Sequence, residues 1–372
     1  MSAIKLTIPQ INYINIGLMV VSAIAALMYP FETFLFVYAF LGPLHYLTEI
    51  SWLHDRQYFT KGKFDYIPLV IIGLIITFLY FGLVPNAPTG TSSFLTYMAF
   101  AAALVFATVK KGMHRIGYLV LAAFAVLLFS GNEVYHNVFG VFLPTLIHVF
   151  IFTALFILVG ALKGRDVSAL LSLVAFAICS TVFFFYHPDR SAYAVDDYIR
   201  NSFGYMTNEG NFSDGFVSLN YMFMKVFHLH DFDPRGFSSL TGFVESFNSF
   251  LYSNPIALSV MSFIAFAYMY HYLNWFSKTS IIQWHAISRV RLGGIVALWI
   301  ASIALYMYDY RVGLKWLFFL SFSHVLLEFP LNHITFINIG KEIKQIVTTG
   351  KFSKPPVNTG NKPAARTPVA SR

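Results

Sequence analysis

Apolar runs broken by short polar segments extend along most of the chain. Ten of these runs approach the length, about 20 residues, that an α-helix needs to cross a membrane. Within each run the apolar residues are continuous rather than alternating, which argues against a transmembrane β-barrel. The pattern predicts an all-α fold, a polytopic transmembrane helical bundle of about ten spans, at residues 11–30, 31–50, 65–84, 92–109, 115–131, 139–162, 167–186, 253–276, 292–309 and 314–337.

Two segments depart from this pattern. Residues 187–250 mix polar and aromatic residues, and the amphiphilic stretch Phe216–His230 within them predicts an interfacial or re-entrant helix. Residues 341–372 are rich in Pro, Lys, Ser and Thr and have no apolar period, so we expect a disordered basic tail. The chain thus divides into seven spans in 1–186, a loop at 187–250, three spans in 251–340, and the tail.

The connections between the predicted spans alternate in charge. The segment 187–250 has eight acidic and four basic residues. The connections on the other side are basic, and the positive-inside rule predicts that they lie in the cytoplasm together with both termini. An even number of spans, such as ten, satisfies this prediction. The basic residues are Lys5, Arg56, Lys61, Lys63, Lys110, Lys111, Arg115, Lys163, Arg165, Lys278, Arg289 and Arg291.

Composition agrees with a membrane protein. Hydrophobic residues make up 57% of the chain and charged residues only 11%, whereas a soluble domain has about 25% charged residues. We therefore expect a multi-pass protein of the plasma or inner membrane. The net charge of +8 comes from residues at helix ends, so we expect membrane lipid and no nucleic acid as a partner. The single cysteine, Cys179, excludes an intramolecular disulfide and a multi-thiolate metal site within one chain.

Histidine and glutamate recur at one spacing near both ends of the chain. "HYLTEISWLH" and "HVLLEFPLNH" share the order His, three residues, Glu, four residues, His. Positions i and i+4 differ by about 40° around a helix, so each His–Glu pair presents two donor atoms on one face. The last histidine turns by a further 140° or so, and a straight helix would point it elsewhere. Pro330 could break the second helix before that histidine.

The predicted topology brings further histidines to the same cytoplasmic side. His271 ends the eighth span and His285 follows it. Iron, manganese and zinc accept imidazole and carboxylate ligands, and without thiolates iron or another metal that binds oxygen and nitrogen is favoured. Facing helices of a bundle can supply such ligands. The alternative is that each pair only makes hydrogen bonds at a helix end. The candidate metal ligands are His45, Glu49, His271, His324 and Glu328, with His54, His285 and His333 as second choices.

A second group faces the other side of the predicted membrane. Glu133 and His136 have the Glu-x-x-His spacing of di-iron bundles, and His148 lies deeper in the same predicted span. Three interpretations stay open: a second metal site, a path for a proton or polar ligand, or a cap of the sixth span.

The layout of histidines at the cytoplasmic ends of aromatic-rich spans resembles that of membrane non-haem iron oxygenases. These are the desaturase and hydroxylase group and, more loosely, the Brp/Blh-type carotene dioxygenases. His45, Glu49, His271, His324 and Glu328 carry the resemblance, which covers no continuous stretch. The adjacent His-His boxes of desaturases are absent. The resemblance implies iron, molecular oxygen and an apolar substrate such as a lipid, fatty acyl chain or carotenoid.

The sequence thus predicts an integral membrane oxidoreductase with a non-haem iron site near the cytoplasmic face, served by an electron-transfer partner. Alternatives are a proton-coupled transporter or channel that uses intramembrane His and Glu, a protein that binds haem between two histidines, and a structural or assembly protein. Geometry separates these hypotheses. Convergence of three or more candidate ligands indicates a metal enzyme, whereas residues strung across the membrane indicate transport.

Overall fold

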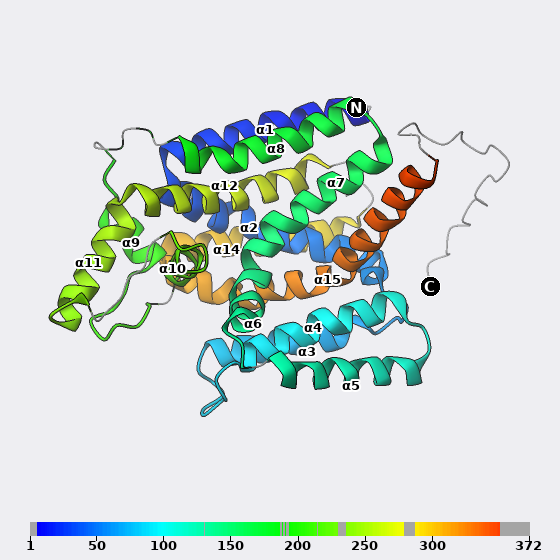
Figure 1. Cartoon of the computed structure of the whole chain (residues 1–372), viewed down its shortest axis with the longest axis horizontal. Helices are drawn as coiled ribbons and strands as arrows, with labels where there is room; N and C mark the ends of the chain where they lie inside the picture. Colours follow the sequence, from blue (N-terminus) through cyan, green and yellow to red (C-terminus); the bar gives the residue numbers. More distant parts are fainter. Residues whose placement is uncertain are drawn as a thin grey trace.

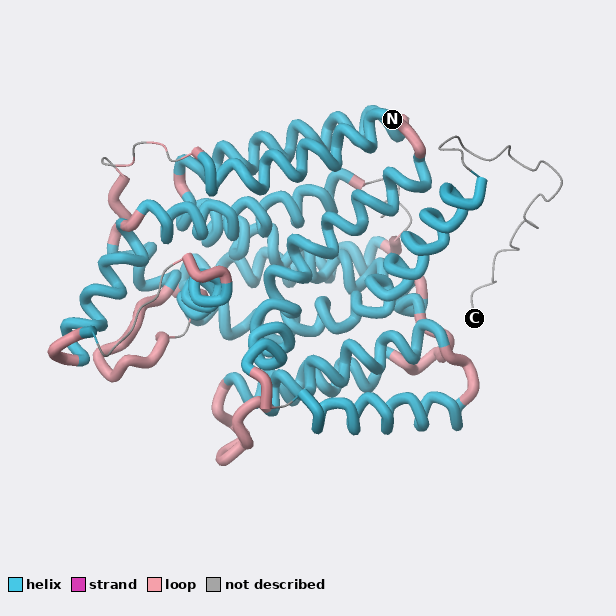
Figure 2. The backbone as a smooth tube through the Cα atoms, in the orientation of Figure 1, coloured by secondary structure: helices cyan, strands magenta, loops and turns pink. Residues whose placement is uncertain are grey.

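The computed structural model describes residues 6–129, 131–186, 188, 190, 193–213, 215–229, 236–278 and 287–349. Apart from one isolated β-bridge, the regular elements in these residues are all helices, as Figures 1 and 2 show. The prediction of an all-α fold is confirmed for this part of the chain.

Seven helices among the described residues are long and apolar enough to cross a membrane, which indicates a membrane-embedded protein. The remaining predicted spans correspond to α2 (Pro30–Asp55), α3 (Tyr66–Tyr80) and α5 (Gly112–Phe129), so the total of about ten spans stays a prediction. Six of the seven are α1 (Ile8–Met28), α4 (Thr91–Thr108), α8 (Val167–Phe185), α12 (Pro255–Ser277), α14 (Arg289–Tyr308) and α15 (Tyr310–Thr349). The seventh is one continuous helix made of α6 (Glu133–Asn137), η2 (Val138–Phe152) and α7 (Thr153–Gly164).

The long helices give the bundle two ends (Figure 1). α1 begins and α15 ends at one of them, which we call the basic end because the basic connections after α2, α7 and α12 belong to it. The described residues of the segment predicted as a loop, 187–250, lie at the other end. They form the helices α9 (Asp197–Phe203) and α10 (Val217–Val226) and most of α11 (Leu240–Ser253). α10 lies within the amphiphilic stretch and packs against α12 and η2. Whether it is interfacial or re-entrant stays a prediction.

The last helix is longer than the sequence pattern predicts. α15 runs without a break through Pro330, so this proline does not end the helix. Neighbouring helices can compensate for the hydrogen bond that a proline removes inside a membrane helix. The helix also continues over residues 341–349, where we predicted a disordered tail, and this stretch contains the helix-forming residues Lys, Glu and Gln. The rest of the predicted tail lies outside the described residues.

Four helices enclose the centre of the bundle. α12 packs against α2 and η2, and α15 packs against the same two helices, so that the four form a closed circuit. α12 is buried along most of its length. Its start is set locally, because the Asn254 side chain accepts a hydrogen bond from the Ile256 N–H and Pro255 occupies the first turn. On one side of this centre, α3 and α4 pack on α15, and α5 packs on α4.

Candidate metal centre

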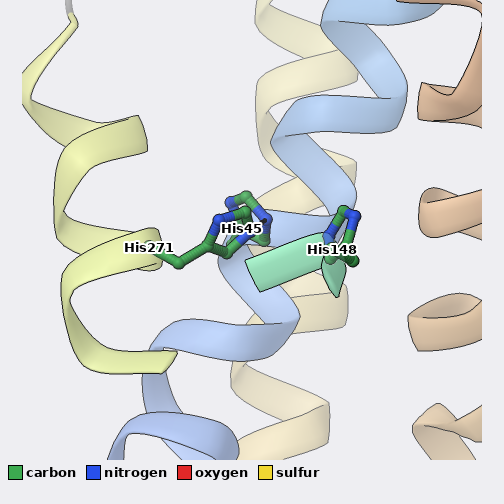
Figure 3. A group of neighbouring side chains, drawn as sticks. All are labelled: His45, His148 and His271. Carbon is green, nitrogen blue, oxygen red and sulfur yellow. Dashed lines mark hydrogen bonds between the residues drawn. The ribbon is translucent and has the colours of Figure 1, made fainter. Parts of the chain in front are cut away.

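Four buried histidines, one from each helix of the central circuit, meet inside the bundle. The Nε2 atoms of His45 and His271 lie 3.1 Å apart, and those of His148 and His324 also lie 3.1 Å apart. Neighbouring rings around the circuit have centroids 4.7 to 5.4 Å apart. Figure 3 shows His45, His148 and His271 pointing toward one another from three helices. We call these four residues the histidine cluster.

Two buried glutamates adjoin the histidine cluster. The Glu49 Oε2 atom lies 3.1 Å from the Nε2 atom of His45, one turn earlier in α2. The Glu328 Oε2 atom lies 3.1 Å from the Nδ1 atom of His148, which belongs to η2. The spacing predicts a partnership between His324 and Glu328 on one face of α15. The two do share that face, but the contact of Glu328 is with another helix.

The outer nitrogen of one histidine has a well-aligned partner. The Nδ1 atom of His271 lies 2.8 Å from the hydroxyl oxygen of Thr153, the first residue of α7. Histidines that bind metals through one ring nitrogen usually hydrogen-bond through the other, which fixes the ring. Thr153 holds the ring of His271 in this way and turns its Nε2 toward the centre, whereas Glu328 lies within 3.1 Å of the His148 Nδ1 atom without an aligned hydrogen bond.

Unsatisfied polar atoms surround the same centre. The Nδ1 atoms of His45 and His324 and the Oε2 atoms of both glutamates have no aligned hydrogen-bond partner among the described residues. Leaving such a buried atom unpaired costs about 1–3 kcal/mol. Two nitrogens that bind one metal at about 2.0–2.1 Å lie about 3 Å apart, which the paired Nε2 atoms match. Groups of three of these donors therefore lie close enough together to hold a metal ion.

Possible ligand sets follow from the distances. The donor atoms of His45, His148 and His271 all lie within 4.8 Å of one another, and so do those of His45, Glu49 and His324. The five first-choice candidates from the sequence, His45, Glu49, His271, His324 and Glu328, thus come together in one place.

The second-choice candidates do not join them. His54 is exposed at the end of α2, where its Nδ1 atom lies 3.5 Å from the Tyr58 hydroxyl. His333 is buried on another face of α15, and its Nε2 atom lies 2.8 Å from the carbonyl oxygen of Phe100. Because α15 is continuous, nine residues after His324 bring the chain about 180° around the helix. His285 lies outside the described residues.

His148 is the ligand candidate that the sequence interpretation misplaced. We grouped it with Glu133 and His136 on the opposite side, but it belongs to the histidine cluster. Glu133 instead makes an exposed ion pair of 2.7 Å with Lys225, and the His136 ring packs beside Tyr135. His148 lies in the wide π-helical turns of η2, a form that is frequent at functional sites. The one sequence signal was a lone histidine deep in an apolar run.

A cavity of about 800 Å³ adjoins the cluster and reaches the basic end of the bundle. His45, His271 and both glutamates line its deep part. Ile8 of α1 and Gly164 of α7, near the ends of their helices, line the outer part. Its volume falls within the range of about 300–1,000 Å³ that small-molecule sites occupy.

Buried tyrosines cover another side of the cluster. The Tyr46 ring stacks on His324, with centroids 4.3 Å apart and an interplanar angle of 24°. Its hydroxyl lies 2.7 Å from that of Tyr272. Gly42 leaves room for this hydroxyl, because a Cβ atom at position 42 would lie only 3.1 Å from it. The stack holds the ring of His324, whose Nδ1 atom has no partner among the described residues.

Comparisons with protein families, with curated proteins and with solved structures found no match for this chain.

Proposed function

We propose that the protein is an integral membrane oxidoreductase whose non-haem metal centre is held by the histidine cluster. The observation that carries the proposal is the convergence of four Nε2 atoms, in pairs 3.1 Å apart, inside a helical bundle. Ionisable side chains are costly within a membrane and mark functional sites. Glu49 and Glu328 provide two carboxylates that balance the charge of a divalent cation.

Iron is the metal that we propose for this centre. The donors are nitrogen and oxygen atoms, a set that non-haem iron accepts. Bound iron would supply the ability to activate molecular oxygen, as the resemblance to membrane non-haem iron oxygenases implies. The chain itself would orient His271 through Thr153 and exclude water with the apolar residues around the cluster.

The haem alternative fits the cluster poorly. A haem between two axial histidines needs an open slab for its ring, whereas Nε2 atoms in the cluster approach each other to 3.1 Å. Transport is also less favoured, because a path requires polar residues along the membrane normal. The candidate ligands instead lie close to one another, and His136 and His333 lie apart from them with other contacts.

The proposed substrate is apolar, a lipid or a carotenoid-like molecule, and it would occupy the cavity of about 800 Å³ beside the cluster. Phe156, Ile157 and Leu331 contribute apolar walls. Such substrates partition into the bilayer, which suits a site enclosed by membrane helices. Turnover would require an electron-transfer partner, and the membrane would be the plasma or inner membrane.

Metal content tests the proposal. The detergent-purified protein is reconstituted with Fe²⁺ under anaerobic conditions and analysed for bound elements. We expect about one iron per chain in the wild type and a loss in His148→Ala and His324→Ala. His333→Ala is the matched control, since His333 is also buried in the bundle but lies outside the cluster. Absence of metal from the folded wild type, or equal content in all variants, would contradict the proposal.

A further inference from the structure

The cavity beside the histidine cluster is lined by apolar side chains over much of its surface and by lysines at one end. Apolar side chains line much of it, including Ile11, Phe156 and Trp275. At the basic end the lining contains two lysines, Lys163 near the end of α7 and Lys278 directly after α12. The cavity is therefore an apolar chamber with a cationic mouth.

Lys278 is the more buried of the two lysines that line this chamber. It is partly buried, and among the described residues its side chain makes no hydrogen bond and no ion pair within 4.0 Å. Burial lowers the pKa of Lys278 to about 8, while Glu328 and Glu49 oppose that shift from α15 and α2. The amine is thus mostly protonated at neutral pH. A partly buried ammonium group without a close partner of opposite charge favours the binding of a ligand that carries a negative charge.

The two buried carboxylates of the site determine which end of the cavity favours the negatively charged group of a ligand. Glu49 and Glu328 line the deep part of the cavity beside the cluster, where they would repel a second carboxylate. Lys278 lies seven residues beyond His271, or about 10 Å of helix, toward the mouth. An anionic group is therefore favoured at the mouth, and an uncharged chain is favoured next to the histidines.

We propose that the cavity binds a single-chain amphiphile with one anionic head group, a long-chain carboxylic acid. Its carboxylate would pair with the ammonium of Lys278, and its hydrocarbon chain would extend along the apolar walls toward His271 and His45. A charge-assisted pair of this kind is stronger than a neutral hydrogen bond. This inference names the substrate class of the proposed oxidoreductase and rests on it for turnover, whereas binding of the acid can be measured separately from metal content.

Tryptophan fluorescence reports on the chamber, because Trp52 and Trp275 both line it. Full-length protein in phosphatidylcholine nanodiscs is titrated at neutral pH with dibromostearic acid, whose bromine atoms quench nearby tryptophans. Dibromostearyl alcohol has the same chain and an uncharged head. Each titration uses wild type, Lys278→Gln and Lys163→Gln, with and without added Fe²⁺. Lys163→Gln is the matched control, because Lys163 is exposed at the same mouth.

We expect the acid to quench the wild type with an affinity that falls at least about tenfold in Lys278→Gln and changes little in Lys163→Gln. The alcohol should bind both lysine variants as it binds the wild type. Equal affinities of acid and alcohol for the wild type, an unchanged affinity in Lys278→Gln, or no binding of the acid would each overturn the inference. Metal analysis of the same samples shows independently whether the proposed metal centre fails.

Discussion

The Nε2 atoms of His148 and His324 lie 3.1 Å apart although 176 residues separate them in the chain. This contact joins η2 to α15 and closes the circuit that His45 and His271 complete from α2 and α12. Two imidazoles can share a hydrogen bond only when one ring donates and the other accepts. A cation bound between two such pairs, with carboxylates beside them, would satisfy the ring nitrogens better than hydrogen bonds between the rings.

Thr153 orients a ligand rather than binding metal itself. Replacing it in Thr153→Val removes the oxygen that lies 2.8 Å from the Nδ1 atom of His271 and keeps the side-chain shape. We expect metal affinity to fall about 10–100-fold, the usual cost of losing such a partner. Competition with a chelator of known affinity measures the change. Thr145→Val is the control, because among the described residues the Thr145 hydroxyl donates its hydrogen bond to the Val141 carbonyl in the same helix segment. An equal loss in both variants would refute the assigned role.

The Tyr46 ring positions His324 by stacking on it, whereas its hydroxyl contacts Tyr272, and two substitutions separate these effects. Tyr46→Phe keeps the stack but loses the 2.7 Å contact with Tyr272, so we expect it to destabilise the fold by about 1 kcal/mol with little change in metal affinity. Tyr46→Leu removes the stack as well, and we expect metal affinity to fall about 2–10-fold. Thermal unfolding and metal titration measure the two quantities. A larger loss of metal affinity in Tyr46→Phe than in Tyr46→Leu would argue against positioning by the ring.

Asp65 attaches α5 to the rest of the bundle. Its two oxygens accept hydrogen bonds of 2.7 and 3.0 Å from Arg115, and it also accepts the Gly62 N–H at 2.7 Å. Because the pair is largely buried, we expect Asp65→Ala to lower the free energy of unfolding by about 2 kcal/mol. Asp55→Ala breaks the exposed pair with Arg291 and should cost about 0–1 kcal/mol. Equal melting temperatures of the two variants would show that the Asp65 contacts add no more than a surface pair.

Binding of the carboxylic acid should depend on pH through Lys278. The pKa of Lys278 is lowered to about 8, so its amine carries a charge below that pH and loses it as the pH rises. A bound carboxylate favours the charged form and moves the loss to higher pH. We therefore expect the affinity for dibromostearic acid to be steady near pH 7 and to decline above about pH 8. Glu49, Glu328 and His271 also face this lysine, so Lys278→Gln, which should abolish the decline, is the deciding comparison.

The spacing of His and Glu within single helices was enough to predict much of the candidate site from the sequence. His45 with Glu49 and His324 with Glu328 lie on one helical face each, since helix periodicity is a property of neighbouring residues. The same periodicity explains why His333, on a continuous helix, points away to the Phe100 carbonyl. His148 has no partner at helical spacing, and its place could not be predicted from its neighbours.

The sequence by itself determined that the protein is helical and membrane-embedded, where its long helices lie, and which two His–Glu pairs could act together. Length and continuity of apolar runs are local quantities, so they survive folding unchanged. Only the tertiary structure decided that His148 meets His324, that Glu328 contacts His148, and that a chamber with Lys278 at its mouth adjoins them. These relationships depend on how each helix is rotated and packed against helices far away in the chain, and residue spacing within one helix contains no information about that rotation.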